Sequence, residues 1–215
     1  MKKKILPLVI AATVLSPFLM AEAPNTALNL MPYPQQVEQH NSSIQLNSDF
    51  TVFIKGFQSD RVSLTAKRFI DRLERQTGMP ILDWQTSDAS SADLIIDIQR
   101  GPKTKIQNID SDESYRITMK GQQITLSSLS PYGAIRGIET LLQLVYTTRA
   151  GYFMPAVTIV DEPRFRWRGV SFDTSRHFID FDVLLRQIDA MTSAKMNVFH
   201  WHFWDDQGIR IKTDS

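Results

Sequence analysis

The order strand, helix, strand between residues 169 and 204 constrains the fold more than any other feature of the chain. Residues 169–174 and 197–204 are short apolar runs that predict strands. Between them, residues 180–194 repeat apolar side chains at helical spacing, and Lys195 follows where the helix dipole favours a positive charge. A strand, a helix and a strand within about 35 residues indicate a βαβ unit with parallel strands. We therefore expect an α/β fold here.

The preceding residues, 24–163, carry elements of their own. Residues 60–77 have the apolar spacing of an amphipathic helix, and Ser130 and Pro131 begin a second helix as N-cap and first helical residue. Short runs that predict strands lie at 43–46, 50–54, 94–98, 115–119 and 124–126. The pattern predicts an α+β domain that ends near Pro163, where the composition changes and three of the four Trp follow.

The N-terminus has the pattern of a secretory signal peptide at residues 1–23. Three lysines at 2–4 precede a mostly apolar stretch at 5–20, and Ala-Glu-Ala at 21–23 fits a cleavage site. The alternative is a transmembrane anchor, for which the apolar stretch is short. We expect cleavage, a periplasmic or secreted protein, and no membrane contact afterwards.

Composition removes several classes of function. The chain has no Cys, which excludes a disulfide scaffold, a Cys-ligated zinc site and an iron–sulfur cluster. Lys and Arg number 24 against 23 Asp and Glu, a formal net charge of +1. This balance gives no electrostatic reason to expect nucleic acid or an anionic membrane as a partner.

Polar residues follow each of the two strands of the βαβ unit. Arg176 comes after the first strand and Asp205 after the second. Since parallel strands end at one edge of a sheet, we expect these side chains to face each other. Trp201 and Trp204 add aromatic surface, and an aromatic face beside an Arg and carboxylates suits a sugar. A purely structural Asp–Arg ion pair is the alternative.

These two segments carry a resemblance to a known family. Residues 168–178 read RGVSFDTSRHF and residues 195–207 read KMNVFHWHFWDDQ. They resemble the start of the catalytic barrel in glycoside hydrolase family 20, the β-N-acetylhexosaminidases. Residues 31–34, 130–137 and 157–163, with the hairpin that begins at Tyr115, are similar to the α/β domain that precedes this barrel. The resemblance implies an α+β domain at 24–163, followed at 164–215 by the incomplete start of a (β/α)8 TIM barrel.

The resemblance also implies functional roles. Arg176 matches the arginine that binds hydroxyl groups of the terminal sugar, and Asp205 matches an aspartate that supports the catalytic acid through a histidine. His202 lies in the same motif and is a further catalytic candidate. The implied substrate is an oligosaccharide with a terminal N-acetylhexosamine, such as a chitin fragment, cleaved with the substrate's own acetamido group as nucleophile. No cofactor is implied.

The Asp-Glu pair that performs acid catalysis in the family matches no residue of this sequence. We therefore expect these 215 residues to be inactive alone. Two alternatives stay open. One is a non-catalytic carbohydrate-binding or interaction fragment. The other is a metal-dependent hydrolase that uses His200 and His202, which lie two residues apart on one face of a strand.

Overall fold

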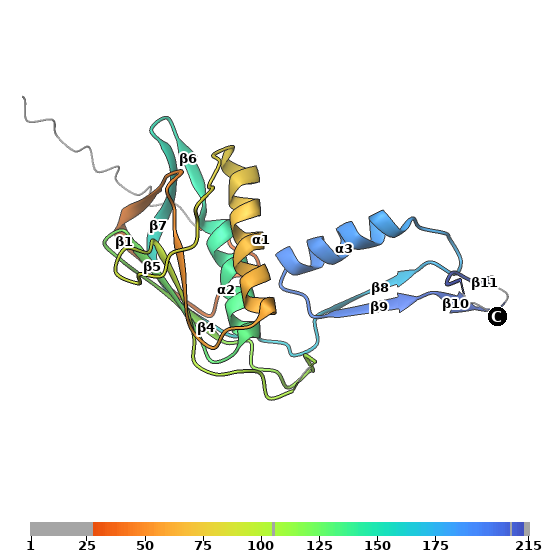
Figure 1. Ribbon diagram of the computed structural model, residues 1–215. Helices are drawn as coiled ribbons and strands as arrows, with labels where there is room; N and C mark the ends of the chain where they lie inside the picture. Colours follow the sequence, from red (N-terminus) through yellow and green to blue (C-terminus); the bar gives the residue numbers. More distant parts are fainter. Residues whose placement is uncertain (1–27, 105, 207, 213–215) are drawn as a thin grey trace, which may run out of the picture.

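The computed structural model describes residues 28–104, 106–206 and 208–212. The predicted signal peptide lies outside the described residues. The chain forms two parts, which we call the sheet domain, up to Asp161, and the C-terminal unit, from Gly169 onward (Figure 1). Within the described residues, no helix is both long and apolar enough to cross a membrane.

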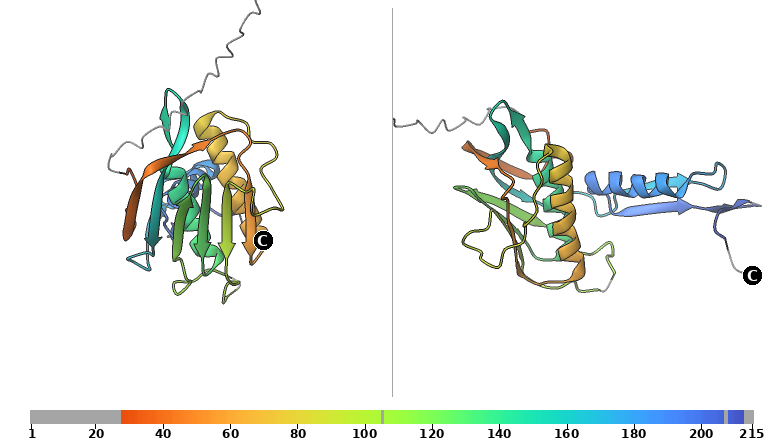
Figure 2. Two further views of the ribbon diagram at one scale, coloured as in Figure 1. Left: turned by 90° about the vertical axis from the view of Figure 1, so that its left-hand side faces the viewer. Right: turned by 45° about the horizontal axis from the view of Figure 1, so that its top comes forward.

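The sheet domain is one seven-stranded mixed sheet with two helices on one face (Figures 1 and 2). Its elements are β1 (Gln36–Leu46), β2 (Val52–Gly56), α1 (Asp60–Thr77), β3 (Leu94–Ile98), β4 (Tyr115–Lys120), β5 (Gln123–Ser128), α2 (Pro131–Leu144), β6 (Tyr146–Thr148) and β7 (Gly151–Asp161). The strand order is β1-β7-β4-β5-β3-β2, and β6 pairs with the first three residues of β7. Strands β2, β3 and β5 are parallel to one another, and the other pairs are antiparallel.

Both predicted helices of the sheet domain are confirmed. Helix α1 begins after Ser59, whose hydroxyl accepts the Val62 backbone N–H, and ends at Gly78, which has a φ of 70°. Helix α2 begins at Pro131 after the Ser130 cap. The core lies between these helices and the sheet. Its largest fully buried side chains are Phe69, Ile44, Ile70, Leu73, Leu94, Ile96, Ile98, Ile117, Ile124, Leu126, Leu141 and Met154.

Two glycines allow α2 to lie directly on the sheet. A Cβ on Gly133 would be 2.0 Å from the Ser114 carbonyl oxygen, and one on Gly137 would be 2.2 Å from Leu126 Cδ1. A side chain at position 133 would collide with the backbone and push the helix away, and one at position 137 would displace the Leu126 side chain. The contact explains why the helix carries glycine at two interior positions, where it costs about 1 kcal/mol relative to Ala.

At one edge of the sheet, the strands are longer and more numerous than the sequence pattern predicts. Strand β1 extends back to Gln36, and β7 was not predicted as a strand. The first half of β1 is polar and partly exposed, so it lacks the alternation of a half-buried strand. Within β7, Pro155 argues against a strand, but it pairs with Ser43 beside the irregularity in β1, where a missing ladder N–H is tolerated.

The C-terminal unit is a βαβ unit followed by a short hairpin (Figure 1). It consists of β8 (Gly169–Asp173), α3 (Phe181–Ser193), β9 (Val198–His202), β10 (Trp204–Asp205) and β11 (Gly208–Ile209). Strands β8 and β9 are parallel, as predicted, although β9 ends at His202 rather than Trp204. Residues beyond Phe203 turn back in the β10–β11 hairpin.

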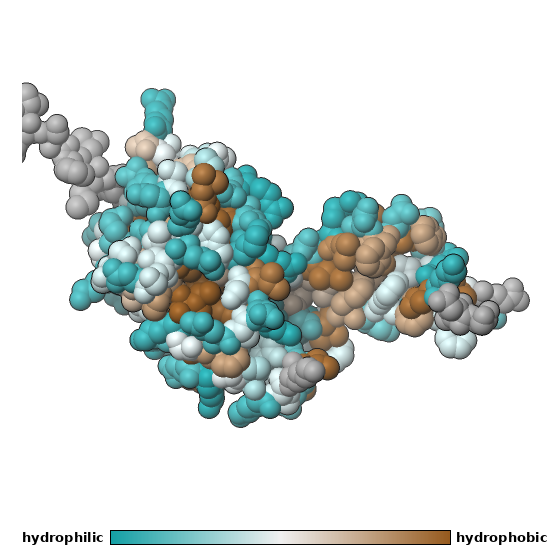
Figure 3. Space-filling model, in the orientation of Figure 1, coloured by the Kyte–Doolittle hydropathy of each residue, from teal (hydrophilic) through white to brown (hydrophobic). Residues whose placement is uncertain are grey.

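Much apolar surface of the C-terminal unit is exposed. Helix α3 buries Leu184 and Met191 but leaves Phe181 64% exposed, with Leu185 and Ile188 also exposed. Figure 3 shows the resulting apolar surface along this unit. The unit contacts the sheet domain on the side of α1 and α2, and the rest of it projects away (Figures 1 and 2).

Candidate active site

The candidate site lies where β8 and β9 end side by side. The parallel register places Asp173, the last residue of β8, opposite His202, the last residue of β9. We call residues 173–176 and 202–206, which are the last residue of each strand and the residues after it, the rim. Because both strands point the same way, the rim collects the polar side chains that the sequence places after each strand.

Asp173 organises the first half of the rim. Its Oδ1 accepts the backbone N–H of Ser175 at 3.0 Å and of Arg176 at 3.1 Å, and its Oδ2 pairs with the Arg176 guanidinium. The backbone hydrogen bond from Arg176, followed by the bond from its guanidinium, holds the pKa of Asp173 below its ordinary value. Sequence reasoning assigned Asp173 no role, although its hydrogen bond to the Ser175 N–H, two residues on, is that of an Asx turn.

Arg176 bridges the two strands. One terminal nitrogen of its guanidinium pairs with Asp173 and the other with Asp205, which follows β9. The prediction that Arg176 and Asp205 face each other is confirmed. The hydrogen bond to Asp173, with both carboxylate charges, raises the pKa of Arg176. The side chain remains 66% exposed, so a fixed cationic group with free surface is presented to solvent.

Of the two histidines of β9, His202 lies beside the ion pairs of Arg176, whereas His200 contacts Ser171. His202 Nδ1 lies 3.6 Å from Asp173 Oδ2, so His202 is associated with Asp173 rather than with Asp205. His200 is exposed and its Nδ1 lies 3.2 Å from Ser171 Oγ. The rings of His200 and His202 are stacked, with centroids 6.3 Å apart.

The donor set for the metal-hydrolase alternative is incomplete in the described part of the chain. No group of three or more His, Asp or Glu side chains is placed there to hold one metal ion. The carboxylate of Asp173, which lies 3.6 Å from His202, is engaged by Arg176. The geometry therefore favours an arginine-centred site.

Residues after β9 form hydrogen bonds with the backbone and side chains of the rim. Arg210 donates from Nε to the Thr174 carbonyl oxygen at 2.9 Å and from Nη2 to the Ser175 carbonyl oxygen at 2.7 Å. Ser175 Oγ donates to the Gly208 carbonyl oxygen at 2.9 Å. These contacts cross about 35 residues of sequence and involve no recognisable motif, so sequence reasoning missed Arg210.

Trp204 of the rim and Trp201, which precedes the rim in β9, have different environments. Trp201 is partly buried, stacks at a tilt on Phe203, and donates its indole N–H to Thr174 Oγ1 at 2.9 Å. This contact gives Trp201 a structural role, in contrast to the sugar-facing surface predicted for it. Trp204 is 64% exposed and retains a free aromatic face.

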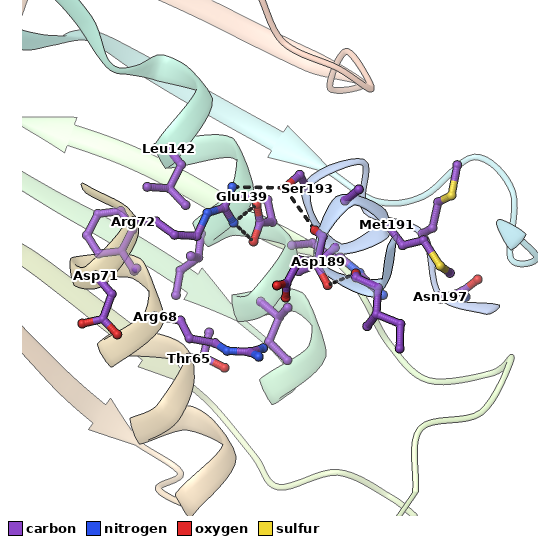
Figure 4. Close-up of a pocket in the computed structure, with 18 of the residues that line it drawn as sticks. Thr65, Arg68, Asp71, Arg72, Glu139, Leu142, Asp189, Met191, Ser193 and Asn197 are labelled. Carbon is purple, nitrogen blue, oxygen red and sulfur yellow. Dashed lines mark hydrogen bonds and ion pairs between the residues drawn. The ribbon is translucent and has the colours of Figure 1, made fainter. Parts of the chain in front are cut away.

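A separate groove of about 960 Å³ lies between α1, α2 and α3, and no rim residue lines it (Figure 4). Two of the charged groups that line it, Arg72 and Glu139, are paired with each other. Arg72 also donates to Ser193 Oγ at 3.2 Å. The groove is therefore a contact between the sheet domain and the C-terminal unit, and the catalytic candidates lie elsewhere.

Comparisons with known proteins cover both parts of the chain. Residues 27–162 match the model of glycosyl hydrolase family 20, domain 2, and residues 165–215 match the model of the catalytic domain of the same family. The chain is 46% identical to the human β-hexosaminidase subunit beta over 103 residues, which are 47% of this chain and 18% of that protein.

Solved structures give the same result. The X-ray structure of Flavobacterium johnsoniae chitobiase superposes with a TM-score of 0.80 at 39% identity, covering 86% of this chain and 28% of that one. The Vibrio harveyi exo-β-N-acetylglucosaminidase, solved in complex with N-acetylglucosamine, superposes with a TM-score of 0.68 at 25% identity. The match covers 85% of this chain and 26% of that one. The chain thus spans less than a third of each of these three proteins.

Proposed function

Because this chain belongs to glycosyl hydrolase family 20, we propose that its rim is the sugar-binding side of a β-N-acetylhexosaminidase active site. The resemblance seen in the sequence is confirmed. So is the predicted fold class, an α+β domain followed by the start of a TIM barrel. The observation that carries the functional proposal is the exposed Arg176 guanidinium, held between Asp173 and Asp205 at the ends of two parallel strands.

The proposed ligand is the terminal N-acetylhexosamine of a β-linked oligosaccharide. A guanidinium in a fixed orientation donates hydrogen bonds to neighbouring sugar hydroxyls, and the exposed face of Trp204 offers a surface for sugar C–H groups. The complex of the Vibrio harveyi enzyme with N-acetylglucosamine supports this class of ligand. Chitin fragments are one source of such a sugar.

The proposed chemistry is substrate-assisted hydrolysis, in which the acetamido oxygen bonds to the anomeric carbon of the same sugar while the glycosidic C–O bond breaks. A general acid protonates the leaving oxygen, and a water molecule then opens the cyclic intermediate to give the free sugar. Asp205 is engaged as an acceptor by Arg176, which suits a supporting carboxylate better than a proton donor. His202, beside Asp173, would assist in orienting the rim. The Asp-Glu pair that the family uses for acid catalysis matches no residue of this sequence, so we propose that these 215 residues bind the sugar without hydrolysing it.

We also propose that the protein is exported by its N-terminal segment and acts in the periplasm or outside the cell. N-terminal sequencing of the exported protein tests this proposal. The sequence should begin at Pro24, whereas a mature protein that retains residues 2–4 would contradict export by cleavage.

A chimera tests the proposed function. Residues 28–212 of this chain replace the matching part of the Flavobacterium johnsoniae chitobiase, whose structure it matches over most of its own length. The chimera should release nitrophenol from a nitrophenyl N-acetylglucosaminide. Arg176→Ala in the chimera should lower kcat/KM roughly ten- to a hundredfold, because a charged hydrogen bond to the sugar is lost.

The matched control is Arg186→Ala, which removes an exposed arginine of α3 in the same unit and should leave kcat/KM unchanged. A folded chimera without activity, or unchanged kinetics after Arg176→Ala, would overturn the proposal. The unmodified 215-residue chain should release no nitrophenol above the rate of a blank.

A further inference from the structure

Lys195 occupies a backbone position that favours glycine. It follows the last turn of α3 with a φ of 56°, and its N–H donates to the Thr192 carbonyl oxygen at 2.9 Å. Helices commonly end in this left-handed conformation, and glycine adopts it without the cost that a side chain brings. The lysine side chain is nevertheless almost fully buried, at 4% exposure of the residue. It does not remain at the helix end, where a dipole interaction would have placed it.

The ammonium of Lys195 lies in a polar socket of the sheet domain. Its Nζ donates to Thr140 Oγ1 at 2.6 Å and Tyr115 Oη at 2.8 Å, and lies 3.5 Å from Asp161 Oδ2. These three residues belong to α2, β4 and β7. Tyr115 Oη also donates to Asp161 Oδ2 at 2.7 Å. Burial lowers the pKa of Lys195, and the charge of Asp161 opposes this shift.

The backbone at Lys195 is tied to the same domain by a second route. Arg168 Nε donates to the Lys195 carbonyl oxygen at 2.8 Å. The Arg168 guanidinium also pairs with Glu113, a buried carboxylate that binds Arg136 of α2. The turn between α3 and β9 is therefore held through both a side chain and the main chain.

We propose that Lys195 is a positioning residue that fastens the C-terminal unit to the sheet domain. Strand β9 begins three residues later, at Val198, and ends at the rim. Insertion of the ammonium into the socket fixes the start of β9, and with it the direction in which β9 carries the rim away from the sheet domain. A methionine would fill the same space but would leave Asp161, Tyr115 and Thr140 without their shared donor. The proposal goes beyond the proposed function, because it concerns how the two parts are joined and needs no substrate.

Amide hydrogen exchange of the 215-residue chain tests the proposal. Lys195→Met removes the ammonium at nearly constant length, and Lys195→Gly also relieves the left-handed backbone. In both variants the amides of β9 should exchange roughly ten- to a hundredfold faster, since a charged group loses its hydrogen bonds. The amides of β3 and β5, inside the sheet domain, should keep their rates. Arg186→Met, an exposed change on α3, is the control and should alter neither set.

Lys195→Gly separates the two roles of this position. If the residue served only the helix end, glycine would preserve or slow exchange in β9, and that result would overturn the proposal. Unprotected β9 amides in the unmodified chain would also overturn it, as would equal acceleration in β3, β5 and β9. Because no turnover is measured, failure of the proposed hydrolase activity would leave this result unaffected.

Discussion

Glu113 is the buried charge on which two arginines depend, and its replacement should destabilise the chain more than any surface charge change. Its carboxylate binds Arg136 through Nε at 2.8 Å and through Nη2, and binds Arg168 through the other oxygen. The side chains of Glu113 and Arg136 are 6% and 7% exposed, and that of Arg168 is 14% exposed. Glu113→Gln keeps the shape but leaves both guanidiniums without an anion.

The expected loss of unfolding free energy is about 3–5 kcal/mol, the usual cost of breaking a buried ion pair by removing one partner. Urea denaturation followed by far-UV circular dichroism measures this loss. Asp71→Asn is the matched control, because Asp71 pairs with Lys67 on the exposed face of α1. That change should cost less than about 1 kcal/mol. Equal effects of the two changes, or a loss below about 1 kcal/mol for Glu113→Gln, would show that the buried carboxylate does not stabilise the fold through its two arginines.

Two further predictions concern groups with shifted pKa values. Asp173→Asn in the chimera should lower kcat/KM about tenfold and leave expression unchanged, because Arg176 loses one of the two carboxylates that orient it. An unchanged kcat/KM would show that Asp173 does not contribute to the site. Burial and the charge of Asp161 raise the pKa of Tyr115 above its ordinary value of 10.0, so the folded state keeps this proton longer than the unfolded state. The stability that Tyr115 contributes is therefore fully present below pH 10 and falls as the pH rises further. The urea midpoint should then decline less steeply above pH 10 in Tyr115→Phe than in the unmodified chain. Equal slopes of midpoint against pH in the two proteins would contradict the raised pKa of Tyr115.

The sequence predicted the elements whose signals are local. Helix α1 has a serine cap, a continuous apolar face and a terminal glycine, and its predicted range agrees with the structure. The βαβ unit was recognised because its strand and helix patterns are short, strong and consecutive. Strand β7 was missed because Pro155 interrupts its pattern, and only its pairing with Ser43 shows that the proline is tolerated there.

The same distinction holds for the site. Arg176 and Asp205 could be paired from the sequence, because parallel strands bring their carboxyl ends together. Asp173 and Arg210 were not assigned, since their roles arise from a backbone turn and from a return of the chain after β9. Lys195 was misjudged because its position beside a helix end gave a sufficient local explanation. The socket that holds it is formed by β4, α2 and β7, which no local pattern connects to it.

Arg176 is proposed to bind the terminal sugar, and a crystal structure of the chimera with N-acetylglucosamine would show whether it does. The sugar should lie at the rim, with hydroxyl groups within hydrogen-bond distance of the Arg176 guanidinium, while Asp173 and Asp205 keep their contacts with that guanidinium. A sugar bound in the active site without contact to Arg176 would show that this arginine does not bind it.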